Sequence, residues 1–234
     1  MTSNQKTFLL DIKREDLLDY LDHGKVFAEI GVAEGGFSQD IVRRCQPAIL
    51  VLVDPWMHQS TPDYAPDENN VSDHEQDRRF HSVSSMFEGQ NVEILRETSL
   101  EAAARFSDAA FDYIYIDAMH GFDAVSADLK AWWPKLKPDG LLMGHDYANH
   151  QDARKMGFDV IGAVNAFVGE TNCAFVGITN ELYPSYILQK SWQAKGAEIL
   201  KQAPILCSFE LGLLSWDLLS FSDGSFKSFP RFGR

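Results

Sequence analysis

The sequence predicts an α/β fold in which a mostly parallel sheet carries helices on both faces, a doubly wound arrangement. The first observation is that short apolar segments alternate with helix-like segments along the chain. The second is that several apolar segments are almost unbroken runs, which suits parallel strands buried on both faces. The third is the link NELYP (180–184) between the last two predicted strands. It is too short for a crossover helix, so these two strands should pair antiparallel as a hairpin.

Seven segments have the length and apolar character of strands. They are 25–31, 48–54, 92–95, 111–117, 140–146, 173–179 and 185–190. Six further segments have the pattern of helices. They are 36–45, 73–88, 98–107, 121–134, 157–169 and 191–202. The tetrapeptide KPDG (137–140) is expected to form the turn that leads into the fifth strand.

Bulk properties favour one protein domain over residues 1–234, with a core at about 25–190 and a C-terminal helix and aromatic tail over 191–234. The net charge is −13 and the chain has no basic stripe, which argues against nucleic acid as a partner. The three cysteines are widely spaced and form no C-x-x-C pair. No apolar segment approaches the length of a membrane span. We therefore expect a cytoplasmic protein without a membrane partner.

Two segments fall outside the alternating pattern. The polar, proline-bearing stretch 57–70 follows the second strand, at the sheet edge where ligands bind in such folds, and is interpreted as a lid or a plain connection. The tail 206–234 is aromatic and apolar. It is expected to cover one face of the domain or a neighbouring subunit, so a homo-oligomer is one prediction and a monomer with a folded-back tail is the other.

A glycine-rich turn follows the first predicted strand in VFAEIGVAEGGFSQDIV (26–42). The dinucleotide pattern G-x-G-x-x-G requires a middle glycine that lets backbone approach a pyrophosphate, and Ala33 stands there instead. Glu29 at the strand end would repel a diphosphate and suits a ligand with an ammonium group and no phosphate. S-adenosylmethionine is such a ligand. Glu29, Gly31 and Gly35 are therefore predicted to bind this cofactor.

Two later positions extend the predicted cofactor site. Asp54 ends the second strand, where a carboxylate accepts hydrogen bonds from ribose hydroxyls in nucleotide-binding α/β folds. Thr98 or Ser99 should cap the helix after the third strand, with Glu101 near its start. This corner is in position to border the adenine, so Ser99 is predicted to contact the cofactor, while Thr98 is interpreted as a helix cap.

Acids and histidines follow the fourth and fifth predicted strands. Asp117 ends the fourth strand, His120 is three residues further on, and His145 and Asp146 end the fifth. Because neighbouring parallel strands bring their carboxyl ends together, these side chains should meet at the ligand-binding edge. Asp117, His145 and Asp146 would suit a divalent cation: oxygen ligands favour Mg²⁺, Mn²⁺ or Ca²⁺, and an imidazole also admits Zn²⁺, Ni²⁺ or Fe²⁺. The other interpretation is that such acids cap helices or bind the cofactor itself, and Asp117 is also predicted as a cofactor residue.

With these motifs, residues 25–190 resemble the class I S-adenosylmethionine-dependent methyltransferases. The resemblance implies seven strands in the order 3-2-1-4-5-7-6, with the seventh antiparallel. The D-x-x-H and H-D-Y segments, 117–120 and 145–147, resemble the metal-dependent O-methyltransferases that act on sugar or phenol hydroxyls. By that resemblance Asp117 and Asp146 are metal ligands, His120 is the base that takes the substrate proton, and His145 stands where an acid is common.

The resemblance implies an enzyme that moves a methyl group from S-adenosylmethionine to a hydroxyl of a small molecule, with Mg²⁺ or Mn²⁺ as the expected cation and Asp117 and His120 as catalytic residues. One alternative is a metal-independent O- or N-methyltransferase. More distant alternatives are an NAD-dependent oxidoreductase, disfavoured by the missing glycine and the lack of a Tyr-x-x-x-Lys pair, and a cofactor-binding scaffold without catalysis. The loops 57–80 and 147–158, which should contact the methyl acceptor, carry no pattern that identifies it.

Overall fold

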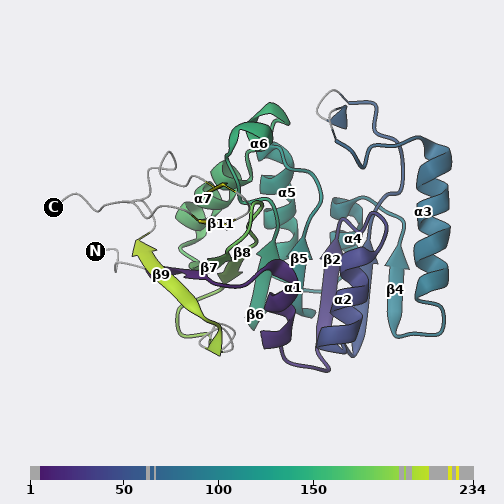
Figure 1. Ribbon diagram of the computed structural model, residues 1–234. Coiled ribbons are helices and arrows are strands. Elements are labelled where there is room, and N and C mark those ends of the chain that lie inside the picture. Colours follow the sequence, from purple (N-terminus) through teal and green to yellow (C-terminus); the bar gives the residue numbers. More distant parts are fainter. Residues whose placement is uncertain are drawn as a thin grey trace.

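A computed structural model describes residues 6–61, 64–65, 67–194, 198, 202–210, 221–222 and 225–226. Nine of its strands form one sheet (Figure 1). These strands are β1 (Lys6–Leu10), β2 (Val26–Ile30), β3 (Ile49–Val53), β4 (Val92–Leu95), β5 (Phe111–Ile116), β6 (Leu136–Gly144), β7 (Ala174–Thr179), β8 (Tyr186–Gln189) and β9 (Ile205–Glu210). A separate two-stranded ribbon pairs β10 (Phe221–Ser222) with β11 (Ser225–Phe226).

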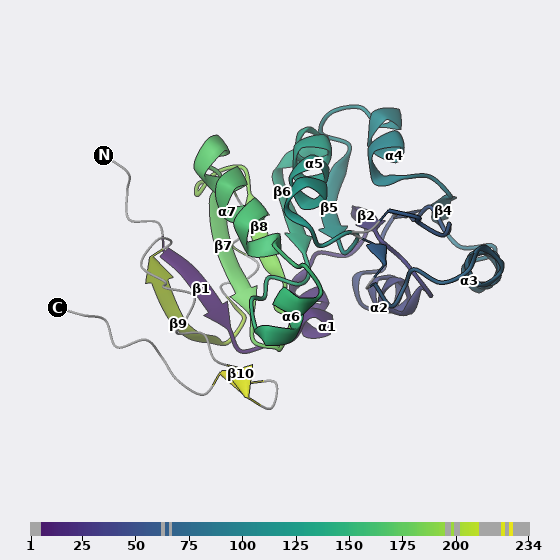
Figure 2. The same cartoon turned by 90° about the horizontal axis from the view of Figure 1, so that it is seen from above.

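Helices cover both faces of the sheet, as predicted. They are α1 (Arg14–Leu17), α2 (Gly36–Cys45), α3 (Asp73–Met86), α4 (Ser99–Arg105), α5 (Phe122–Trp132), α6 (Gln151–Lys155) and α7 (Val160–Thr171), with 3₁₀ turns at Leu18–Tyr20 and Trp133–Lys135. Figure 2 shows α4, α5 and α7 on one face and α1, α2 and α3 on the other. The short helices α1 and α6 were not predicted.

The sheet order is β4-β3-β2-β5-β6-β8-β7-β1-β9. The seven predicted strands are β2 to β8, and β8 runs antiparallel to both β6 and β7. The prediction of a seven-stranded sheet is wrong, and the complete order differs from the predicted one, because two more strands extend the sheet beyond β7. β1 pairs parallel with β7, and β9 pairs antiparallel with β1. Both additions join segments from opposite ends of the chain, which local sequence patterns do not reveal.

Two local predictions also need correction. The strand β6 begins at Leu136, so the expected turn KPDG lies inside it, and the pairing with β5 shifts register between Phe111 and Tyr113 to accommodate the extra residues. Residues 191–194 form no α-helix, and most of the helix expected over 191–202 lies outside the described residues. The same holds for most of the tail 206–234, so its expected covering role stays a prediction.

The core forms two layers, one on each face of the sheet. Along β5, Ile114 and Ile116 face the layer under α4, α5 and α7, while Tyr113 and Tyr115 face the layer under α1, α2 and α3. This alternation follows from the two-residue period of a strand, and burial on both faces explains the unbroken apolar runs. Within the described ranges, no helix is long and apolar enough to cross a membrane.

Candidate active site

The turn after β2 is held in left-handed backbone. Gly31 has φ +87° and Gly35 has φ +78°. A Cβ atom on Gly31 would lie 1.9 Å from the carbonyl oxygen of Asp117, far inside contact distance. The backbone N–H of Asp117 donates to the carbonyl of Ile30 at 2.7 Å. Gly31 is therefore required because the turn after β2 and the end of β5 touch through their backbones, which brings the two predicted motifs side by side.

Asp54 holds this turn in shape. Its Oδ2 accepts hydrogen bonds from the backbone N–H groups of Val32 and Ala33 at 3.0 and 2.9 Å, and its Oδ1 accepts from the N–H of Trp56 at 2.8 Å. The buried indole N–H of Trp56 donates to the carbonyl of Ala33 at 2.9 Å. These bonds stabilise Ala33 at φ +49°, where the dinucleotide pattern has its middle glycine. The ribose contact predicted for Asp54 stays a prediction.

Glu29 is a buried carboxyl group beneath the turn. The hydroxyl of Ser38 donates to its Oε2 at 2.5 Å. Burial raises the pKa of Glu29 to about 8, because a charged carboxylate loses its hydration there, and the hydrogen bond from Ser38 offsets only part of this effect. A ligand ammonium nearby would favour the charged form, which fits the role predicted for Glu29.

Replacing Glu29 with glutamine should change the pH dependence of stability. The pKa of Glu29 is raised from 4.5 to about 8 on folding, so the folded state binds more protons than the unfolded state between these values, and stability falls as the pH rises through that window. Thermal unfolding without ligand should show equal melting temperatures for Glu29→Gln and wild type near pH 4.5 and a more stable variant at pH 8. Glu88→Gln, at an exposed site, is the control. A constant offset at every pH would contradict this account of Glu29.

A cluster of acids and imidazoles lies at the ends of β5 and β6, as predicted. Nε2 of His120 is 2.9 Å from Oδ2 of Asp146 and 4.0 Å from Oδ1 of Asp117. Nδ1 of His145 is 3.3 Å from Oδ2 of Asp146 and 3.8 Å from Oδ1 of Asp117. Asp146 has φ +59°, in the left-handed region that residues with a side chain adopt less readily than glycine.

The cluster changes the proton affinities of its members. Burial alone would lower the pKa of His120, but the negative charges of Asp117 and Asp146, together with the hydrogen bond that the ring donates to Asp146, outweigh it and raise the pKa to about 10. The pKa of His145 is raised by the same two carboxylates against the effect of burial. Burial would raise the pKa of Asp146, yet both imidazoles together hold it well below its usual range. Asp146 is therefore negatively charged, and its charge stabilises the protonated forms of His120 and His145.

Three further side chains border this cluster and were not predicted. Nη1 of Arg14, at the start of α1, is 2.9 Å from Oδ2 of Asp117. The ring of Phe158 stacks on His120 with a centroid distance of 4.1 Å. The ring of Tyr183, in the turn between β7 and β8, is 6.1 Å from that of Phe158. An arginine among the charged residues 13–16 gives no sequence signal, and single aromatic residues in loops give none either.

Ser99 uses its side chain within the protein. Its hydroxyl donates to Oδ1 of the buried Asp128 at 2.5 Å and accepts from the indole N–H of Trp132 at 2.9 Å. Burial raises the pKa of Asp128 to about 6. The contact of Ser99 with the cofactor stays a prediction, while Thr98 is the expected helix cap and forms a capping box with Glu101.

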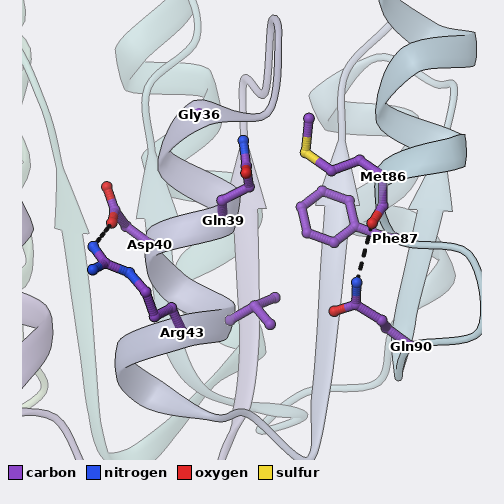
Figure 3. Close-up of a pocket in the computed structure, with 8 residues that line it drawn as sticks. Gly36, Gln39, Asp40, Arg43, Met86, Phe87 and Gln90 are labelled. Atoms are coloured by element: carbon purple, nitrogen blue, oxygen red, sulfur yellow. Dashed lines mark hydrogen bonds and ion pairs between the residues drawn. The ribbon is translucent and has the colours of Figure 1, made fainter.

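A groove on the outer side of the domain lies between α2 and the C-terminal end of α3 (Figure 3). Figure 3 shows Gln39 of α2 on the side of Met86 and Phe87, whereas Asp40 and Arg43 pair with each other on the side of α2 away from them. Its lining consists of Gly36, Gln39, Asp40, Val42, Arg43, Met86, Phe87 and Gln90. None of the predicted site residues lines this groove, so the candidate active site is the edge formed by the glycine turn and the acid–imidazole cluster.

The glycine turn and the acid–imidazole cluster lie at one edge of a doubly wound sheet whose strand β8 is antiparallel. This combination is typical of class I methyltransferases. The family described as "Methyltransferase domain" matches residues 28–147, just over half of the chain and the span from β2 to the end of β6. The chain belongs to this family of S-adenosylmethionine-dependent methyltransferases. A stretch of 67 residues is also 34% identical to an uncharacterized protein, y4gI, of Sinorhizobium fredii, and the match spans 29% of this chain and 7% of that protein.

Solved structures share the fold at low sequence identity. The N-methyltransferase NodS of Bradyrhizobium japonicum has a TM-score of 0.54 at 14% identity, over 76% of this chain and 94% of that one. Spermidine synthase of Thermotoga maritima has a TM-score of 0.52 at 12% identity, over 81% of this chain and 62% of that one. An O-methyltransferase family protein of Burkholderia thailandensis has a TM-score of 0.50 at 13% identity, over 76% of this chain and 55% of that one. These names cover different activities, so the similarity describes the fold and leaves the methyl acceptor open.

Proposed function

We propose that this domain transfers a methyl group from S-adenosylmethionine to a hydroxyl group of a small molecule, a sugar or a phenol. The observation that carries the proposal is the 2.9 Å contact between His120 and Asp146 beside Asp117, whose backbone touches the glycine turn at Gly31. A general base, its orienting carboxylate and the predicted cofactor turn thus share one edge of the sheet. The net charge of −13 supports a small-molecule acceptor over nucleic acid, and we retain a cytoplasmic location as part of the proposal.

The chemistry requires an activated nucleophile. Methyl transfer is an in-line displacement at the sulfonium methyl group, and a neutral hydroxyl attacks poorly. In this proposal the neutral imidazole of His120 takes the proton from the acceptor hydroxyl, and Asp146 orients the ring through Nε2 and stabilises the imidazolium that forms. The remaining nitrogen, Nδ1, is then the atom that accepts the proton. A base of this kind contributes about 10²–10⁴-fold to the rate.

A divalent cation fits the same edge. Ligand atoms of Asp117, His120 and Asp146 all lie within 4.8 Å of one another, and His145 adjoins two of them. Two carboxylates with an imidazole suit Mn²⁺ or Mg²⁺, with the later transition metals as alternatives. When bound, such an ion lowers the pKa of a coordinated hydroxyl and fixes its position. This set has His120 in place of the predicted His145. His120 therefore serves either as a ligand or as the base.

Metal binding is tested by titrating Mn²⁺ into chelator-treated protein and following the free ion by electron paramagnetic resonance. Wild type should bind one ion per chain, and Asp117→Asn and Asp146→Asn should each weaken binding by at least about 10–100-fold, since even outer-shell substitutions have effects of that size. Asp123→Asn, at an exposed site in the first turn of α5, is the control. If wild type binds no Mn²⁺, the proposed Mn²⁺ or Mg²⁺ site is contradicted.

A specific contact favours that second candidate, a metal-independent methyltransferase acting on oxygen or nitrogen. Arg14 already pairs with Oδ2 of Asp117 at 2.9 Å and so neutralises one of the proposed ligands. In that case Asp117 and His145 shape the pocket and His120 alone serves as the base. An acceptor screen with S-adenosylmethionine, run with chelator and with Mn²⁺, separates the two candidates by whether turnover needs the ion.

The acceptor class is supported by the aromatic side chains at this edge. Phe158 stacks on His120, and Tyr183 lies near Phe158, His145 and His150 with ring centroids 6.1, 6.5 and 4.7 Å away. Such faces suit the flat side of a phenol or the C–H face of a sugar. The screen should therefore contain both kinds of compound, with primary amines as the nitrogen alternative.

A further inference from the structure

We infer that Arg14 binds the α-carboxylate of S-adenosylmethionine and so makes the N-terminal helix α1 a part of the cofactor site. The inference rests on the proposed function, because it assigns a residue to one end of the proposed cofactor. The matched family span begins at residue 28 and leaves Arg14 outside it. Neither the glycine turn nor the acid–imidazole cluster contains this residue.

Arg14 lies between the two parts of the site. Its Nη1 is 2.9 Å from Oδ2 of Asp117, at the end of β5. Its guanidinium lies 4.9 Å from the ring centroid of Phe37, the second residue of α2 and the neighbour of the glycine turn. Asp117 in turn touches Gly31 through its backbone. The guanidinium therefore borders the space between the turn after β2 and the end of β5, where the amino-acid end of the cofactor must lie if Glu29 receives its ammonium group.

A zwitterionic ligand at this edge needs a cation beside its carboxylate. Glu29, Asp54, Asp117 and Asp146 bring carboxyl groups to the ends of four strands. The two imidazoles of the cluster already pair with Asp146, at the end of β6, and a ligand ammonium group would favour the charged form of Glu29. The carboxyl groups suit the ammonium and sulfonium groups of the cofactor but would repel its carboxylate.

Arg14 is permanently charged and partly exposed, with 26% of its side-chain surface open. Its Nη1 pairs with Asp117 and its Nε lies 3.3 Å from Oε1 of Glu15, and its planar guanidinium carries further N–H donors that a ligand carboxylate can accept from. Arg14 supplies the positive charge that a zwitterionic ligand needs at this point.

The side chain of Arg14 is not what fixes α1 in place. Strand β1 anchors the segment by pairing with β7 and β9, and Leu17 and Leu18 are fully buried. The backbone N–H of Arg14 also donates to Oε1 of Glu181 at 2.9 Å, a bond that Arg14→Gln and Arg14→Lys leave in place. Replacing Arg14 should therefore leave the fold intact, so that an effect on ligand binding can be measured.

The test compares two ligands that differ only in the carboxylate. S-adenosylmethionine and decarboxylated S-adenosylmethionine are titrated by calorimetry into wild type, Arg14→Gln and Arg14→Lys. Arg44→Gln is the matched control, because Arg44 pairs with Asp19 at 2.7 Å and has a similar side-chain exposure of 22%. We expect wild type to bind the intact cofactor about 10–100-fold more tightly than the decarboxylated one, and Arg14→Gln to lose that preference by weakening only the intact cofactor. Arg14→Lys should retain part of the preference, and Arg44→Gln all of it.

Each other outcome overturns the inference in a recognisable way. Equal weakening of both ligands by Arg14→Gln would mean that the residue only supports the site. Unchanged affinity for both would mean that Arg14 does not contact the cofactor. If wild type bound neither ligand, the proposed function itself would be contradicted, and the inference about Arg14 would fail with it. Melting temperatures of all variants, measured alongside, separate loss of fold from loss of a contact.

Discussion

Replacing Gly31 with alanine is expected to unfold the protein or to lower its free energy of unfolding by about 4 kcal/mol or more. Single substitutions rarely destabilise a protein by this much, and those that do include severe steric clashes. The new Cβ atom would lie 1.9 Å from the carbonyl oxygen of Asp117 and 2.5 Å from its carbonyl carbon, and backbone atoms cannot rotate away as a side chain can. The φ of +87° adds strain for any residue with a side chain. Relief requires β2 and β5 to separate at their ends.

Gly24→Ala is the control for this prediction. Gly24 also has a positive φ, +69°, but a Cβ atom there would meet nothing within 4 Å. Its substitution isolates the backbone strain, about 1–2 kcal/mol. Urea unfolding followed by circular dichroism measures both variants. Similar losses for the two variants would mean that the backbone of Asp117 leaves room for a Cβ atom at position 31, and that this contact does not hold the two halves of the site together.

Replacing His120 with asparagine is expected to lower kcat by about 10²–10⁴-fold while leaving the affinity for S-adenosylhomocysteine nearly unchanged. In the free protein His120 has a pKa of about 10, so most molecules carry a protonated imidazole near neutral pH. Wild-type activity on an oxygen acceptor should therefore rise with pH towards about 10, and the variant should lose that rise. Measuring kcat/KM across the pH range tests both statements.

His81→Asn is the matched control. His81 lies on the exposed side of α3, where its Nδ1 contacts the backbone oxygen of Asp77 at 2.7 Å. This variant should retain wild-type rates and the same pH profile. A pH profile of His120→Asn that matches wild type would show that another group takes the proton. A large loss of cofactor affinity in His120→Asn would show that the imidazole serves binding instead.

Much of the fold could be predicted because its signals are local. Seven apolar segments, the glycine turn and the short link between the last two predicted strands each lie within a few consecutive residues. The prediction that Asp117, His120, His145 and Asp146 meet needed only the rule that parallel strands end at one edge, and the distances of 2.9–4.0 Å confirm that they meet. Their chemical roles stay proposals.

The remaining features depend on contacts between distant segments. β1 pairs Phe8 with Gly177, and β9 adds a strand that no local pattern indicated. Arg14 reaches Asp117 only because β1 sets the position of α1. Ala33 keeps a glycine-like backbone because Asp54 and Trp56 bond to it, so the missing glycine did not signal a different turn. The spacing of residues along the sequence does not predict any of these tertiary contacts.

Calorimetric titration of S-adenosylhomocysteine into the wild-type protein, with NAD⁺ as the comparison ligand and Glu29→Gln as the variant, tests the central claim most directly. The claim is that the turn from Glu29 to Gly35 binds a cofactor with an ammonium group and no phosphate. It predicts one S-adenosylhomocysteine per chain, no binding of NAD⁺, and weaker binding by Glu29→Gln. Binding of NAD⁺ without S-adenosylhomocysteine, or binding that Glu29→Gln leaves unchanged, would contradict it.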